Sequence, residues 1–137
     1  MDRPEVILPR FQKLDEYLSV LENLQQYGQE EFLDDPEHYG SAERFLQLAI
    51  EALNDIGNHI VATEGWRGID RYSDIPRRLR EHGIIDETMK EHWIQMVGFR
   101  NVLVHDYVDL NRRRVYEVLQ HNLADLMEIK KALAEML

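Results

Sequence analysis

The 137-residue sequence contains no cysteine, which excludes disulfide bonds, cysteine nucleophiles and sulfur-ligated metal sites. It also lacks any run approaching the roughly 20 apolar residues that a membrane-spanning helix requires. The first residues include Asp2, Arg3 and Glu5 where a signal peptide would have an apolar run. We therefore expect a cytoplasmic protein that does not enter a membrane.

The signals of several enzyme classes are also missing. There is no glycine-rich phosphate-binding loop, so the sequence gives no support to NTP hydrolysis. The three serines, Ser19, Ser41 and Ser73, fall at surface or capping positions of predicted helices, which makes none of them a convincing nucleophile. No two of the six histidines are three or four residues apart, the spacing that places two imidazoles on one helix face. We therefore predict no metal and no other cofactor.

Acidic residues outnumber basic ones by 26 to 16, and the formal net charge is −10. This surplus opposes nucleic-acid binding, because most of that affinity comes from neutralising phosphates. Residues 66–114, however, hold ten Lys or Arg against eight Asp or Glu. The asymmetry favours a modest basic region that binds RNA weakly, on an acidic body that could meet a basic partner. An acidic surface that only keeps the protein soluble is the alternative.

Apolar residues recur at helical spacing along four long stretches, and none alternates for long enough to form a strand. Two of the predicted long helices span residues 9–27 and 35–63. The third follows a cap at Asp86 and carries the motif described below, and the fourth begins after Asp109 and runs almost to residue 137. A short helix is predicted over residues 73–82. The length fits one domain, residues 1–137. We therefore predict an all-α fold, an antiparallel up-and-down four-helix bundle with one additional short helix.

Punctuating residues support these boundaries. Asp35 before Pro36 is typical of a helix start, and Gly28 and Gly83 are placed to end helices. The predicted core residues share helical spacing within each segment: Phe11, Leu14, Leu18, Leu21 and Leu24; Phe45, Ala49, Ala52, Ile56 and Ile60; Trp93, Met96, Val97 and Phe99; Val115, Leu119, Leu126, Ile129, Leu133 and Met136.

The segment GFRNVLVHDY, residues 98–107, concentrates the chemistry of the chain. Arg100 keeps its charge at any working pH and offers a planar fork of donors to phosphate oxygens. His105, with an ordinary pKa of about 6.5, can accept and donate protons near neutrality. Asn101 adds a neutral donor and acceptor, and Tyr107 adds a hydroxyl. The alternative is structural, because cations near a helix C-terminus interact favourably with the helix dipole and pair with carboxylates.

This decapeptide resembles the signature of the HepT-like toxins, a branch of the HEPN superfamily. In that signature four positions separate an arginine from a histidine, and the first of the four is polar. One further residue then separates the histidine from a tyrosine. Here these fall on Arg100, Asn101, His105 and Tyr107. The likeness extends to residues 45–61 and 72–83. It implies the same helical bundle.

The resemblance implies a metal-independent endoribonuclease toxin of a type VII-like toxin–antitoxin system. His105 would take the proton of a ribose 2′-hydroxyl, and Arg100 would stabilise the charge that builds on the phosphate. Asn101 would orient the phosphate or the histidine. The expected products are a 2′,3′-cyclic phosphate and a 5′-hydroxyl end.

Helix geometry constrains this site, because Arg100 and His105 lie about 140° apart around an unbroken helix. Either the helix ends or bends near Val104, or the two side chains come from different subunits. HEPN ribonucleases resemble the second arrangement, since they are generally two-fold dimers whose motifs line a shared groove. We expect a homodimer, with Val102, Leu103 and Val104 anchoring the segment.

In HepT-like proteins the position of Tyr107 resembles an acceptor of adenylyl groups, which a cognate minimal nucleotidyltransferase antitoxin adds. A bulky anionic group there would block RNA. A tyrosine that only packs on the bundle is the alternative.

Two further polar groups stand out. Arg112, Arg113 and Arg114 open the last helix, where positive charge is unfavourable, and could contact RNA or form a solvated turn. Glu51, Asp55 and Asn58 share one helix face and could meet a cation or a basic partner, or be simply solvated.

A non-catalytic module of the same fold is the rival function. It would bind a nucleotide or dock the nucleotidyltransferase without cutting RNA. Incubation of the free protein with RNA separates the two, because only the enzyme produces cyclic-phosphate ends.

Overall fold

The computed structural model describes residues 4–105 and 110–137, and this part of the chain is all-helical, as predicted. Its elements are α1 (Pro4–Leu24), α2 (Gln29–Asp34), α3 (Pro36–Glu64), α4 (Asp74–Glu81), α5 (Glu87–His105) and α6 (Arg112–Ala134).

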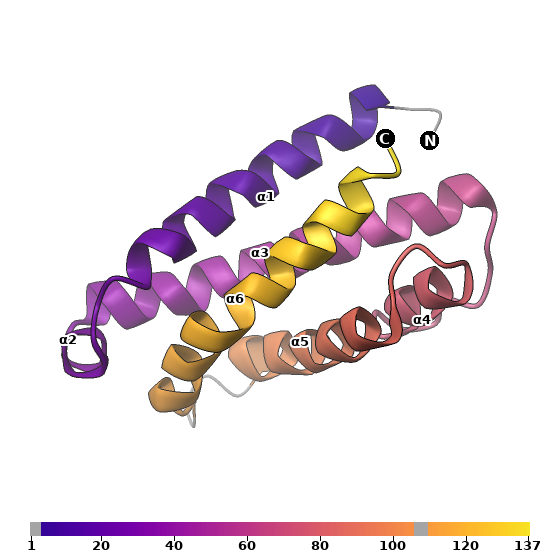
Figure 1. Cartoon of the computed structure of the whole chain (residues 1–137). Coiled ribbons are helices and arrows are strands. Elements are labelled where there is room, and N and C mark those ends of the chain that lie inside the picture. The colour runs from indigo at the N-terminus through magenta and orange to yellow at the C-terminus, as the bar shows by residue number, and fades with distance from the viewer. Residues whose placement is uncertain (1–3, 106–109) are drawn as a thin grey trace.

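The four long helices α1, α3, α5 and α6 alternate in direction along the chain (Figure 1). Helix α3 contacts every other described helix, and α6 also packs against α1, α2 and α5. The long central helix α3 is therefore the element on which the others are arranged.

The prediction of one short helix was incomplete, because α2 precedes α3 as a second one. Helix α1 ends at Leu24, before Gly28, and Gly28 instead stands at the start of α2. Helix α2 has only six residues and is fixed by tertiary contact, since its Phe32 is completely buried.

Side-chain caps fix several helix ends. Asp35 accepts a hydrogen bond from the amide of Glu37 at 2.9 Å, and Asp86 accepts one from the amide of Met89 at 2.8 Å. Both caps were predicted, and they satisfy amides that have no partner within the helix. At the start of α6 the cap is Asn111, whose side chain accepts from the amides of Arg113 and Arg114.

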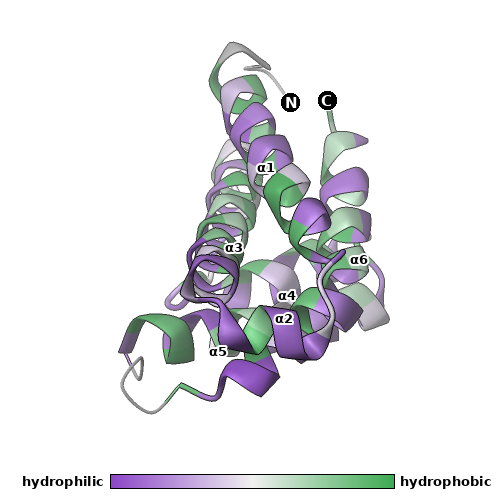
Figure 2. Cartoon of the chain, turned by 90° about the vertical axis from the view of Figure 1, so that its left-hand side faces the viewer, coloured by the Kyte–Doolittle hydropathy of each residue, from purple (hydrophilic) through white to green (hydrophobic). Residues whose placement is uncertain are grey.

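The core follows the predicted stripes, and each long helix shows alternating hydrophilic and hydrophobic segments (Figure 2). All five predicted core residues of α1 are buried, as are Trp93, Met96, Val97 and Phe99 of α5. Phe45, Ala52 and Met136 are only partly buried and pack at the margin of the core.

Helices α3, α4 and α5 meet at Gly57. A Cβ atom at this position would lie 2.6 Å from Cγ2 of Ile75 and 2.8 Å from Cη2 of Trp93, so only glycine fits without a shift of its neighbours. One turn away, the indole N–H of Trp93 donates to Oδ1 of the buried Asn54 at 2.8 Å. This contact sets the distance between the helix that carries Glu51 and the helix that carries Arg100.

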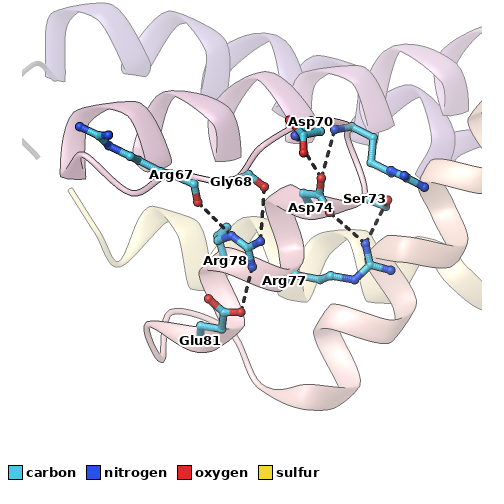
Figure 3. A network of polar contacts seen from close by, with 9 residues as sticks. Arg67, Gly68, Asp70, Ser73, Asp74, Arg77, Arg78 and Glu81 are labelled. Carbon is cyan, nitrogen blue, oxygen red and sulfur yellow. Dashed lines mark hydrogen bonds and ion pairs between the residues drawn. The ribbon is translucent and has the colours of Figure 1, made fainter.

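The segment between α3 and α4 is held by a polar network (Figure 3). Oδ2 of Asp74 accepts from the amides of Asp70 and Arg71 at 3.1 and 3.2 Å. The guanidinium of Arg78 donates to the carbonyls of Arg67 and Gly68, at 3.0 and 3.4 Å. Backbone amides and carbonyls of the connection thus find partners on α4, which orders the segment that leads to Tyr72.

Candidate functional site

Arg100 lies on α5 and turns its guanidinium toward α3. Its Nε donates to Oε2 of Glu51 at 2.8 Å, its Nη2 lies 2.7 Å from the same oxygen as an ion pair, and both side chains are partly buried. The side chain of Gln47 donates to the same oxygen at 3.1 Å. Since two nitrogens of Arg100 meet one carboxylate, the orientation of the guanidinium plane is fixed from α3.

Asn101 follows Arg100 on α5 and is exposed. Its Oδ1 accepts a hydrogen bond from Nη1 of Arg100 at 3.3 Å. The predicted polar residue is therefore in direct contact with the predicted arginine.

A small hollow of about 210 Å³ opens beside this guanidinium. We call it the Arg100 hollow; it is lined by Glu51, Asn54, Asp55, Tyr72 and Arg100. A neighbouring larger hollow of about 430 Å³, the Asn58 hollow, is lined by Asn58, Ile69, Asp70, Arg71, Tyr72, Ser73, Ile75, Val97 and Asn101. Tyr72 borders both hollows, so they lie next to each other.

Two carboxylates, those of Glu51 and Asp55, line the Arg100 hollow beside the guanidinium. Neighbouring protein atoms partly desolvate the carboxyl of Asp55 and raise its pKa above the ordinary value, although the residue as a whole remains exposed; the nearby charge of Arg10 opposes this rise and that of Glu51 adds to it. The three residues of the predicted polar face of α3 therefore differ in their surroundings. Glu51 forms an ion pair with Arg100 of the same chain, whereas Asp55 and Asn58 are exposed.

His105 is the last residue of α5, and it is exposed. Helix α5 continues through Val104, so it does not end before the histidine. In a helix, five residues correspond to a rotation of about 140° and a rise of about 7.5 Å. Within one chain, the backbone positions of Arg100 and His105 therefore point their side chains to different sides of α5.

The anchoring prediction for residues 102–104 was only partly right. Leu103 is buried, Val104 is half-buried, and Val102 is 41% exposed. The apolar side chain of Val102 consequently lies on the surface of the motif helix.

Tyr107, the predicted modification site, lies outside the described residues. So do Asp106 and Asp109, two acidic residues within and just after the motif.

Arg112, Arg113 and Arg114 open α6, as predicted. The guanidinium of Arg112 lies 4.2 Å from the ring centroid of Tyr39, and its Nε lies 3.7 Å from Oε2 of Glu43. Burial raises the pKa of Glu43, and the charge of Arg112 opposes the rise. Arg112 is thus engaged with α3.

The predicted basic region is extensively paired. Arg77 pairs with Asp74, Arg78 with Glu81, and Arg80 with Glu87, in addition to the pairs of Arg100 and Arg112. The local surplus of arginine is therefore largely compensated by neighbouring carboxylates.

Two residues of this site were not predicted in these roles. Glu51 was assigned to a polar stripe, but its partner Arg100 is 49 positions away and no sequence pattern links them. Tyr72 was not singled out, although an exposed aromatic residue beside an arginine is a detectable signal.

Within residues 4–105 and 110–137, no three His, Asp or Glu side chains gather in a way that could hold a metal ion. No helix in these ranges combines the length and the apolar character needed to cross a membrane.

Comparison with known proteins gives relatives at the level of sequence. A protein of Shewanella oneidensis named mRNA nuclease HepT is 40% identical over 81 residues, which are 58% of this chain and 60% of that protein. The aligned stretch thus spans less than two thirds of that relative. A tRNA nuclease HepT of Aphanizomenon flos-aquae is 24% identical over 124 residues, which are 88% of this chain and 82% of that protein.

Solved structures show the same fold. A tri-AMPylated HEPN toxin of Shewanella oneidensis, in complex with an MNT antitoxin, matches with a TM-score of 0.86 and 26% identity over 95% of this chain and 97% of that one. A toxin–antitoxin structure with AMP-PNP matches with a TM-score of 0.83 and 26% identity, over 93% and 97% of the two chains. The family model described as Ribonuclease HepT-like matches residues 14–133. Since that match covers most of the chain, this protein belongs to the HepT-like ribonuclease family.

Proposed function

We propose that this chain is a metal-independent endoribonuclease, the toxin of a type VII-like toxin–antitoxin pair. Its family, the nuclease names of its relatives, and the similarity to toxins bound to an MNT antitoxin support this function. The observation that carries the proposal is on α5: Arg100 and Asn101 contact each other at the edge of a hollow, and His105 is exposed at the end of the same helix.

In the proposed reaction, an imidazole nitrogen of His105 accepts the proton of a ribose 2′-hydroxyl. The 2′-oxygen attacks the adjacent phosphorus, the bond to the 5′-oxygen breaks, and that oxygen takes up a proton. Arg100 stabilises the negative charge on the phosphate oxygens in the transition state. Asn101 orients the phosphate or the histidine. The products are a 2′,3′-cyclic phosphate and a 5′-hydroxyl end.

We further propose that each site combines Arg100 of one subunit with His105 of another in a homodimer. The angle of about 140° between the two positions on a continuous α5 supports this arrangement.

Inhibition is proposed to act at Tyr107. Its hydroxyl oxygen would attack the α-phosphate of ATP on a cognate minimal nucleotidyltransferase and release pyrophosphate, leaving AMP on the tyrosine. The added phosphate would repel the RNA backbone, and the nucleoside would block its path. Mass spectrometry of the chain after co-expression with that enzyme tests this step; absence of an AMP adduct on Tyr107 would exclude it.

The decisive experiment mixes two inactive variants. Arg100→Ala and His105→Ala should each abolish cleavage, with cyclic-phosphate ends as the readout and EDTA present throughout. If each site spans two subunits, a dimer with one chain of each variant holds one complete site, and random mixing restores about a quarter of the wild-type activity. No recovery in exchanged dimers would refute the shared site.

If wild-type protein produces no cyclic-phosphate ends and does not arrest growth when expressed alone, the ribonuclease proposal is wrong. Binding of the nucleotidyltransferase without cleavage would then favour the non-catalytic module.

A further inference from the structure

We propose that the Asn58 hollow is a subsite for one unpaired nucleobase of the RNA strand, with Tyr72 as its stacking platform. This inference rests on the proposed ribonuclease function and names how that site holds its substrate.

Tyr72 differs from the tyrosines that pack on the core. Its relative exposure is 53%, whereas Tyr17, Tyr27, Tyr39 and Tyr116 are partly buried against the hydrophobic core. An exposed aromatic ring contributes little to stability, but it offers a flat apolar face for a base.

The chemistry of the hollow suits a nucleobase. Ile75 and Val97 give it an apolar floor, and the side chains of Asn58 and Asn101 stand at its border. A base has apolar faces and a polar edge of donors and acceptors. Amide side chains can both donate to and accept from such an edge. The volume of about 430 Å³ lies within the range of small-ligand sites.

The position of the hollow fits a strand that passes Arg100. Tyr72 lines both the Asn58 hollow and the Arg100 hollow, and Asn101 hydrogen-bonds to the guanidinium of Arg100. A phosphate at Arg100 would therefore have the base of a directly flanking nucleotide within reach of Tyr72.

The platform is also held in place. The carbonyl of Tyr72 accepts from the amide of Ile75 at 3.1 Å, and Asp74 accepts from the amides of Asp70 and Arg71 (Figure 3). Because this backbone is already ordered, binding of a base would not lose conformational entropy by ordering the segment.

The test compares Tyr72→Ala with Tyr72→Phe, which keeps the ring. The substrates are a short single-stranded RNA with a mapped cut and the same RNA with an abasic residue on the 5′ or the 3′ side of the cut. We expect Tyr72→Ala to lower kcat/KM on intact RNA about tenfold, within the roughly 5- to 150-fold that base–aromatic stacking contributes. Tyr72→Phe should stay within about twofold of wild type. On the RNA that is abasic at the bound position, wild type and Tyr72→Ala should be equal.

Equal activity of wild type and Tyr72→Ala on intact RNA would overturn the subsite. An equal loss on intact and abasic RNA would also overturn it, because the ring would then act only on the fold. Thermal unfolding of each variant is followed in parallel.

A binding experiment separates this inference from the proposed function. Tyr72→Trp is titrated with the 2′-O-methyl form of the RNA, which lacks the attacking hydroxyl, and its fluorescence change is compared with that of the wild-type tryptophans. Quenching by the intact oligomer, and not by the abasic one, supports the subsite even if wild-type protein cuts no RNA. Absence of quenching refutes it, and equal quenching by free AMP at the same nucleotide concentration would show a mononucleotide site instead.

Discussion

Replacement of Gly57 by alanine tests the contact that holds α3 against α4 and α5. The added methyl group would lie 2.6 Å from Cγ2 of Ile75 and 2.8 Å from Cη2 of Trp93. Neither neighbour yields easily, since both residues are fully buried, Cγ2 is bonded directly to a branched Cβ, and the indole is rigid. We therefore expect Gly57→Ala to destabilise the protein.

The magnitude follows from two opposing contributions. Overpacking of a close-packed core costs about 1–3 kcal/mol, whereas replacing glycine by alanine inside a helix gains up to about 1 kcal/mol. Gly40 provides the matched control, because it lies in the same helix and an added Cβ there would meet nothing within 4 Å. The difference between the two variants removes the helix contribution and isolates the packing cost of about 1–3 kcal/mol.

Thermal unfolding followed by circular dichroism measures this difference. For a chain of this length, 1 kcal/mol corresponds to about 3–4 °C in Tm. Gly40→Ala should unfold at or above the wild-type temperature, and Gly57→Ala should unfold about 3–12 °C below Gly40→Ala. If Gly57→Ala were as stable as Gly40→Ala, the close approach of the three helices would be wrong.

Three further predictions concern single groups. Trp93→Phe removes the indole donor and leaves Oδ1 of the buried Asn54 without its partner. The free energy of unfolding, measured with urea, should therefore fall by about 1–3 kcal/mol. An unchanged free energy of unfolding would contradict the hydrogen bond. Burial raises the pKa of Glu43, which means that the folded state disfavours its charge. Glu43→Gln should therefore raise Tm at pH 7. This gain should fade as the pH falls from the raised pKa of the folded state towards the ordinary value of 4.5, and it should be absent below 4.5, where the carboxyl is protonated in both states; an equal gain at pH 4 would refute the reasoning. Glu51→Gln replaces the carboxylate that orients Arg100. In a cleavage assay, kcat should fall about 10- to 100-fold while KM stays the same or falls. An unchanged kcat would count against this orienting role of Glu51.

The long helices could be predicted from the sequence because each carries several turns of regularly spaced apolar residues, and caps such as Asp35 and Asp86 mark their starts. Helix α2 was missed because its six residues give too few turns for a periodic signal. Its place in the fold depends on burial of Phe32, a tertiary contact that no local pattern contains.

The candidate site also contains residues that the sequence predicted and residues that it did not. The motif on α5 could be found because its residues are close in the sequence, and their spacing showed that an unbroken helix would point Arg100 and His105 to different sides. Whether the helix is unbroken had to come from the structure, in which α5 runs through to His105. The contact of Glu51 with Arg100 depends on how α3 and α5 are rotated against each other, which a single sequence does not encode locally. The same holds for Tyr72, whose position depends on the segment before α4.

The two faces of α3 have separate tasks, and this bears on how the protein could evolve. Leu53, Ile56 and Ile60 are fully buried, whereas Asp55 and Asn58, on the opposite side of the helix, border the hollows. If the hollows hold RNA as proposed, substitutions at 55 and 58 would change the ligand that is preferred while leaving the core side chains of α3 in place. Descendants of one ancestral fold could in this way diversify their targets at little cost in stability.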